Sequence, residues 1–173
     1  MNKRGQVWVE TVIYTLIGLA IMGIILAVVK PSIDAKKDQA ILSQSEELLR
    51  NIKNQIEDVR YYGAGNSRTI ELRIKKGELV IDSKNDSVIF SMDSKYQYSE
   101  LDKEVGDDIK ILTTEKKGDY KVSLKLDYSS SLNLTYTRED KEKIFSTSPT
   151  NYKLNIANNG RVNELINVDF SES

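Results

Sequence analysis

The sequence contains no cysteine and no histidine among its 173 residues. Without cysteine, the chain has no disulfide framework and no thiol chemistry. Without histidine, it lacks the commonest metal ligand and the commonest general base near neutral pH. A secreted body of this composition therefore depends for its durability on its hydrophobic core, on assembly or on glycans.

The chain also lacks an excess of either charge, because 25 Lys and Arg residues offset 26 Asp and Glu residues, for a formal net charge of −1. Nucleic-acid binding needs a clustered basic surface, so we expect no nucleic-acid partner. Glycine-rich phosphate-binding motifs of the GxGxxG and GxxxxGK[ST] types are missing as well. We therefore predict no catalytic residues, no cofactor and no enzymatic activity.

Aspartates in the predicted turns and loops offer the oxygen ligands that calcium prefers. Their spacing matches no calcium-binding loop, and acidic turn residues are usually solvated, so no metal site is predicted. The residues concerned are Asp82, Asp86, Asp93, Asp107 and Asp108.

The most distinctive stretch is an apolar run of 23 residues, from Val7 to Val29, with one charged residue and no proline. As a helix it would span about 35 Å, enough to cross a hydrocarbon core of about 30 Å. A secretory signal has a shorter apolar region and a small-residue cleavage site after it. The run therefore predicts a membrane-spanning helix.

The single charge in this run, Glu10, has two interpretations. A carboxylate within lipid costs on the order of 2 to 4 kcal/mol, so it needs water, a proton or a partner. Glu10 is only four residues beyond Gln6 and could reach water at the membrane surface. Alternatively, it has a dedicated cationic partner, and both interpretations are open from the residues alone.

The segment Lys-Arg-Gly-Gln-Val-Trp-Val-Glu-Thr, residues 3–11, followed by a long apolar helix, resembles the class III signal peptide of archaeal type IV pilins. The resemblance implies that a prepilin peptidase recognises Lys3 and Arg4. It implies cleavage between Gly5 and Gln6, on the cytoplasmic side, with the helix retained. The resemblance extends over roughly residues 1–62.

The same resemblance gives Glu10 a role, because it becomes the fifth residue of the mature chain. In the family, this glutamate neutralises the N-terminal amine of a neighbouring subunit in the filament core. Bacterial pilins usually begin the mature chain with phenylalanine, so Gln6 fits the archaeal pattern better. Archaeal flagellar subunits typically lack the glutamate, which favours a pilin. Pro31 does not fall at the family's usual helix proline.

Beyond the apolar run, the hydrophobic period is that of an amphipathic helix with one buried side. Its apolar positions are Ile41, Leu42, Leu48, Leu49, Ile52, Ile56 and Val59, with Ser45 in the same stripe. Pro31 disfavours a helical conformation at the residue before it. We therefore expect a kink or short break there, with Ser32 or Asp34 as a cap.

From Arg68 on, apolar residues alternate with polar ones in short segments separated by turn residues, which predicts an antiparallel sheet with one buried face. About seven or eight strands would form a small sandwich or a curled sheet wrapped on the helix. Asn158–Gly160 is interpreted as a turn, and Arg138–Lys143 as a surface connection.

The predicted fold class is α+β, with a long N-terminal helix followed by an antiparallel, β-rich, sandwich-like head. The predicted segments are a leader at 1–5, a transmembrane or filament-core helix at 6–30, an amphipathic stalk helix at 31–62, a linker at 63–67 and an extracellular β-rich head at 68–173.

Two N-glycosylation sequons lie in the predicted head, at Asn85 and at Asn133. Such sequons imply surface exposure in a secreted protein. Asn85 falls in a predicted turn. Asn133 and Thr135 fall on the polar face of a predicted strand, so both placements allow modification.

The resemblance implies a structural subunit of an archaeal type IV pilus-like surface filament. The expected partners are other copies of the chain or related pilins, the prepilin peptidase, the pilus assembly machinery and, before assembly, membrane lipid. The N-terminus would be cytoplasmic and the head extracellular. The alternative is a single-pass, membrane-anchored accessory or binding protein, such as a minor pilin-like subunit, that does not form the filament body.

Overall fold

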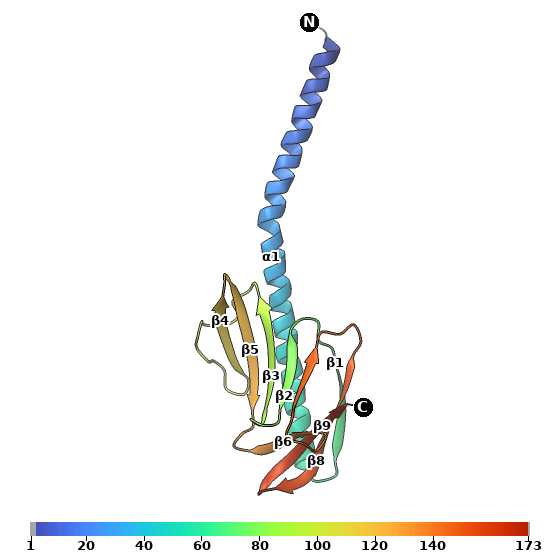
Figure 1. Cartoon of the computed structure of the whole chain (residues 1–173), viewed down its shortest axis with the longest axis vertical. Coiled ribbons are helices and arrows are strands. Elements are labelled where there is room, and N and C mark those ends of the chain that lie inside the picture. The colour runs from blue at the N-terminus through green and yellow to red at the C-terminus, as the bar shows by residue number, and fades with distance from the viewer. Residues whose placement is uncertain (1–2, 173) are drawn as a thin grey trace. The chain divides into compact units, whose positions relative to one another are not determined.

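The computed structural model describes residues 3–172, with side chains from Trp8 onward, and these residues form one α-helix followed by nine β-strands (Figure 1). The α+β class is therefore confirmed. The elements are α1 (Lys3–Tyr62), β1 (Ser67–Leu72), β2 (Glu78–Asp82), β3 (Ser87–Ser94), β4 (Lys110–Lys116), β5 (Asp119–Asp127), β6 (Leu132–Tyr136), β7 (Glu142–Ser146), β8 (Tyr152–Val162) and β9 (Leu165–Glu172).

The chain divides into two compact units, residues 1–37 and 38–173. The second unit is called the body below. Residues of α1 belong to both units, and each unit is described by itself.

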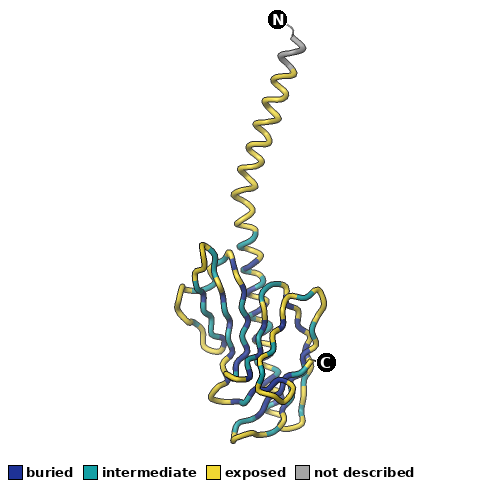
Figure 2. The backbone as a smooth tube through the Cα atoms, in the orientation of Figure 1, coloured by how far each residue is buried: buried dark blue, intermediate teal, exposed yellow. Residues whose placement is uncertain are grey.

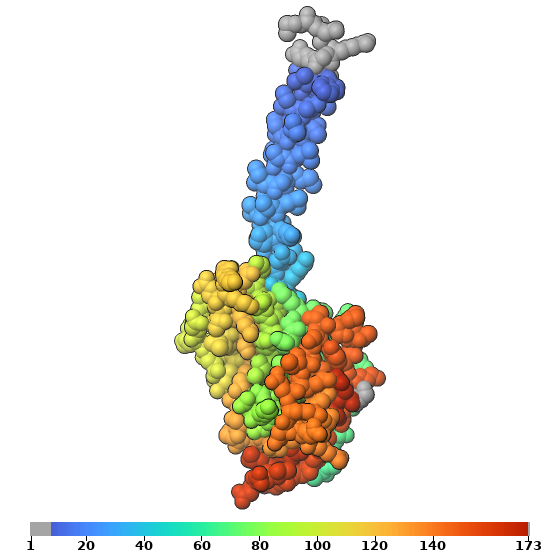
Figure 3. All heavy atoms as spheres, in the orientation of Figure 1, coloured from blue at the N-terminus to red at the C-terminus, as the bar shows by residue number. Residues whose placement is uncertain are grey.

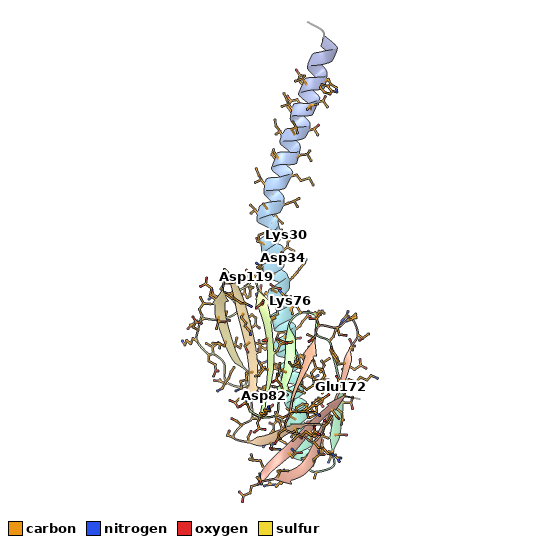
Figure 4. The ribbon with its side chains drawn as sticks, in the orientation of Figure 1. Lys30, Asp34, Lys76, Asp82, Asp119 and Glu172 are labelled. Carbon is orange, nitrogen blue, oxygen red and sulfur yellow. The ribbon has the colours of Figure 1, made fainter. Side chains whose placement is uncertain are left out.

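In the first unit, α1 is continuous through Pro31, and Lys30 and Asp34 lie on the same helix (Figure 4). The expected break is therefore wrong, and Ser32 and Asp34 are not caps. A proline in a helix loses one backbone hydrogen bond. Ending one helix and starting another would leave up to four carbonyls and four N–H groups without helical partners, which is the larger cost.

In the body, α1 buries one side. The fully buried side chains of this stripe are Leu42, Leu49, Ile52, Ile56 and Val59. Their spacing of three, four or seven residues keeps them on one face of a helix. Ile41 and Leu48 are partly buried beside them.

The described strands form two sheets, with the orders β1-β8-β9-β6 and β4-β5-β3-β2-β7 (Figure 1). All neighbouring strands are antiparallel except β6 and β9, which pair in parallel. Apolar side chains of both sheets join the α1 stripe in one hydrophobic core. In the space-filling view, the two sheets form one continuous mass of atoms (Figure 3).

Two strand assignments differ from the sequence prediction. β7 includes Glu142 and Lys143, which were expected in a surface connection, and it pairs with β2 at the edge of the five-stranded sheet. Asn158–Gly160 is not a turn. These residues lie within β8, at an irregularity in its pairing with β9, and the turn between the two strands falls at Asn163 and Glu164.

The C-terminal end of α1 is held by side-chain amides. Asn66 Nδ2 donates to the carbonyl oxygens of Tyr62, at 2.8 Å, and Gly63, at 3.1 Å. Asn158 Nδ2 donates to the Val59 carbonyl at 3.0 Å. The last four carbonyls of a helix have no helical partner, so these bonds satisfy two of them.

Candidate functional site

The strongest functional feature is the apolar part of α1. Every residue from Trp8 to Ile33 is exposed (Figure 2). The large apolar side chains among them are each between 39% and 73% exposed. A patch of this size is far beyond what soluble monomers usually leave in water. The segment therefore needs lipid or other apolar helices around it.

Among the described residues, one helix is long and apolar enough to cross a membrane, and it is α1. This agrees with the membrane-spanning helix predicted from the sequence. From Trp8 to Val29, no apolar residue is buried.

The leader positions lie at the start of α1. Lys3, Arg4, Gly5 and Gln6 are helical in backbone, but their side chains lie outside the described residues. Glu10 is exposed and lies four residues after Gln6 on the same helix. Residues four apart share a helix face, so Glu10 and the predicted new N-terminus lie on one side of α1.

Gly18 and Gly23 lie within the apolar segment and have open space around them. A methyl group added at either position would meet no heavy atom within 4 Å. Small residues let helices approach closely in apolar surroundings. The two glycines are therefore available for helix packing.

The asparagines of the two sequons differ in exposure, whereas their hydroxyl residues, Ser87 and Thr135, are both buried. Asn85 is exposed in the turn between β2 and β3, and its Nδ2 donates to Asp82 at 2.7 Å. Asn133 is only half-exposed. Its partner Thr135 is buried, at 7% exposure, rather than on a solvated strand face as expected. The Thr135 hydroxyl donates to Asp169 Oδ1 at 2.7 Å, so this buried hydroxyl has a hydrogen-bond partner.

The five aspartates considered for calcium do not form one cluster. Asp82 and Asp86 flank the same turn, and burial, followed by the charges of Asp140, Asp82 and Asp127, raises the pKa of Asp86. Asp82 accepts bonds from the backbone N–H groups of Lys84 and Asn85 in its own turn. Asp82 lies at the opposite end of the five-stranded sheet from Lys76 and Asp119 (Figure 4). Asp93 and Asp108 form ion pairs with lysines on other elements. Within residues 3–172, no group of three acidic side chains could hold a metal ion.

A hydrogen-bonded pair fixes the long loop after β3 to α1. The Tyr98 hydroxyl donates to Glu46 Oε2 at 2.7 Å, and Arg50 donates to the other oxygen at 2.6 Å. These bonds lower the pKa of Glu46. Burial, followed by the bond to Glu46, raises the pKa of Tyr98 to about 12.

The body has a polar hollow that could not be predicted from the sequence. It has a volume of about 580 Å³ and lies over β6, β9 and the β8–β9 hairpin. Asn133 lines it, together with side chains from the loop after β6. The hollow combines residues more than 30 positions apart, so only the parallel pairing of β6 with β9 brings them together.

No family model matches the chain, and no curated protein or solved structure shows significant similarity to it.

Proposed function

We propose that this protein is a structural subunit of an archaeal type IV pilus-like surface filament. The observation that carries the proposal is the apolar segment from Trp8 to Ile33, in which every residue is exposed. It has one carboxylate near its start, Glu10, and belongs to the same chain as a compact β-rich body. The pilin-like residues before it, Lys3 to Gln6, add a cleavage site.

The proposed sequence of events begins in the membrane. Lipid covers the apolar segment, with the N-terminus in the cytoplasm and the body outside. A prepilin peptidase recognises Lys3 and Arg4 and cleaves between Gly5 and Gln6. Cleavage removes the two basic residues and creates a new amine at Gln6.

Assembly then transfers the apolar surface from lipid to neighbouring helices. Lipid tails are as apolar as the side chains, so this transfer gives little hydrophobic gain. Close packing and polar pairing must supply the specificity. A Glu10 carboxylate and a Gln6 amine from two copies form an ion pair that is strong in a low-dielectric core. Their partners are other copies of the chain or related pilins, brought together by the pilus assembly machinery.

The second candidate is a single-pass, membrane-anchored accessory or binding protein that does not form the filament body. The polar hollow favours this candidate, because a purely structural subunit has no need of one. Both candidates are cleaved by the peptidase. They differ in abundance, because the accessory protein does not form the body of the filament.

Analysis of sheared surface material tests the proposal. Electron microscopy of the sheared fraction is combined with mass spectrometry of the chain's N-terminus. The proposal expects filaments in which this chain is a main component that begins at Gln6. A chain that begins at Gln6 but stays in the membrane fraction supports the accessory protein. A chain that retains Met1 contradicts both processed forms.

A further inference from the structure

We propose that the polar hollow of the body is a saccharide-binding site. The first observation is the unusual burial of polar side chains on the outer face of the four-stranded sheet. Along β9, Val168 and Phe170 belong to the core, and Asn167 and Asp169 alternate with them on the other face. Such a face is usually solvated. Yet Asn167 and Asp169 are only 5% and 7% exposed.

Thr135 and Asn167 line the hollow and are called its floor below, and hydrogen bonds to each other and to Asp169 hold them in place. Thr135 Oγ1 donates to Asp169 Oδ1 at 2.7 Å, and Asn167 Nδ2 lies 3.3 Å from both Thr135 Oγ1 and the Asn133 carbonyl oxygen. Asp169 also accepts the backbone N–H of Arg138 at 2.6 Å. Buried polar networks of this kind hold their members rigidly. The floor is therefore ordered before any ligand arrives.

The loop that carries Arg138 adopts a costly conformation. Tyr136 and Glu139 exchange two backbone hydrogen bonds around a two-residue turn. Its central residues, Thr137 and Arg138, have φ values of +53° and +63°. Turns of this type favour Asn-Gly, and a β-branched residue at positive φ is an outlier. Strain of this kind gathers at functional sites. Here it places Arg138 beside the hollow.

The lining identifies the class of ligand. Seven of its eight side chains are polar, and four of those are asparagines. Each asparagine offers both a donor and an acceptor. Arg138 and Asp140 both line the hollow, and their charges cancel. The lining therefore suits a neutral ligand rich in hydroxyl groups, which both donate and accept.

Other ligand classes fit less well. A phosphate would need a net positive lining. A nucleobase would need an aromatic platform, and a peptide would need apolar side-chain pockets, whereas Val162 is the one apolar liner. The volume of about 580 Å³ is in the range of small-molecule sites. A short oligosaccharide matches both the size and the chemistry.

The saccharide can come from two sources. Asn133 lines the hollow and is itself a sequon asparagine, so a glycan attached there would begin at the hollow. A free or surface-bound oligosaccharide would use the same donors and acceptors. Neither source depends on filament assembly, so the site can be tested on the monomer in detergent.

The first arm uses full-length protein from a host without N-glycosylation. The probes are an array of defined neutral oligosaccharides and the oligosaccharides released from surface glycoproteins of the producing cells. Hits are titrated by NMR against wild type, Arg138→Ala, Asn159→Ala and Lys141→Ala. Lys141 is the matched control, because it lies in the same loop but does not line the hollow. We expect saturable binding that Arg138→Ala and Asn159→Ala each weaken at least tenfold and Lys141→Ala leaves within twofold.

The second arm uses protein from a glycosylating host. If the ligand is the chain's own glycan, the unglycosylated protein still binds the released oligosaccharide weakly. Glycan protons on Asn133 then show NMR contacts with Asn159 and Val162, and Arg138→Ala removes those contacts. The proposal is overturned if neither arm shows saccharide at the hollow, or if a peptide binds there instead. It is equally overturned if saccharide binding survives in the Arg138→Ala/Asn159→Ala double variant.

Discussion

Asn158 Nδ2 donates a hydrogen bond at 3.0 Å to the carbonyl oxygen of Val59, which lies 99 positions earlier in the chain. The same side chain accepts the Gly160 N–H through Oδ1 at 2.9 Å. One buried amide therefore holds both the last turn of α1 and the irregular part of β8.

Asn158→Ala should destabilise the body by about 2 kcal/mol, because it leaves the buried Val59 carbonyl and the partly buried Gly160 N–H without partners. For a chain of this size, that loss lowers Tm by roughly 4–8 °C. The measurement is thermal unfolding of the full chain in detergent. Asn159→Ala, at the exposed neighbouring position, is the control and should leave Tm nearly unchanged. Equal effects of the two substitutions would show that the Val59 contact is not the cause.

Gly77→Ala should destabilise the body more than Gly118→Ala. Both glycines have a positive φ, of +81° and +84°. A Cβ at Gly77 would overlap the Ser91 carbonyl oxygen and lie 2.6 Å from Met92 Cβ, whereas a Cβ at Gly118 would meet nothing within 4 Å. The left-handed conformation alone costs about 1–2 kcal/mol, and the overlap at Gly77 adds about 1–3 kcal/mol. The difference between the denaturant midpoints of the two variants measures the cost of the overlap at Gly77. Equal midpoints would show that the overlap has no cost.

Tyr98→Phe should lower stability in a pH-dependent way. The bonds from Tyr98 and Arg50 place the folded pKa of Glu46 below its ordinary value of 4.5. Ionised Glu46 therefore stabilises the body above that value, and the contribution is lost as the pH falls through the folded pKa. Loss of the Tyr98 bond should cost about 1 kcal/mol at neutral pH, and the cost should shrink in acid. A difference in Tm that stays constant from pH 7 to about pH 3 would contradict the assignment.

Gly5→Leu should block cleavage by prepilin peptidase, because a bulky side chain would occupy the residue before the proposed cut. Mass spectrometry of the membrane-bound chain should then find residues 1–5 still attached. Gly18→Ala, in the same helix but distant from the cut, should be processed normally. A Gly5→Leu chain of normal mature mass would place the cleavage elsewhere or exclude it.

The periodic parts of the fold could be predicted from the sequence. The apolar run predicts the exposed apolar part of α1, and the stripe from Leu42 to Val59 predicts the face of α1 that is buried in the body. Strict alternation fixes β5, whose Val122, Leu124 and Leu126 are all buried. Local spacing decides these elements, so one segment at a time is enough to find them.

The parts that were missed depend on distant partners. The residues of Asn158–Gly160 are typical of a turn, but the Asn158 side chain is buried and donates a hydrogen bond to the Val59 carbonyl oxygen. β7 has few apolar residues, and Ile144 is exposed, as expected for a short charged edge strand. The polar hollow depends on parallel pairing of β6 with β9. The residue pattern within β6 or within β9 does not predict that the two strands pair. The burial of Thr135, in the sequon of Asn133, is a consequence of the pairing that the structure shows.

The most direct measurement is the number of filaments on cells that make Glu10→Ala, compared with wild type and with a control substitution at an exposed glutamate of the body, Glu164→Ala. Electron microscopy counts the filaments, and mass spectrometry checks that the chain still begins at Gln6. If Glu10 pairs with the amine of another copy, the variant is processed normally and its filaments are lost, whereas Glu164→Ala retains them. Wild-type filament numbers with Glu10→Ala would contradict assembly through this pair.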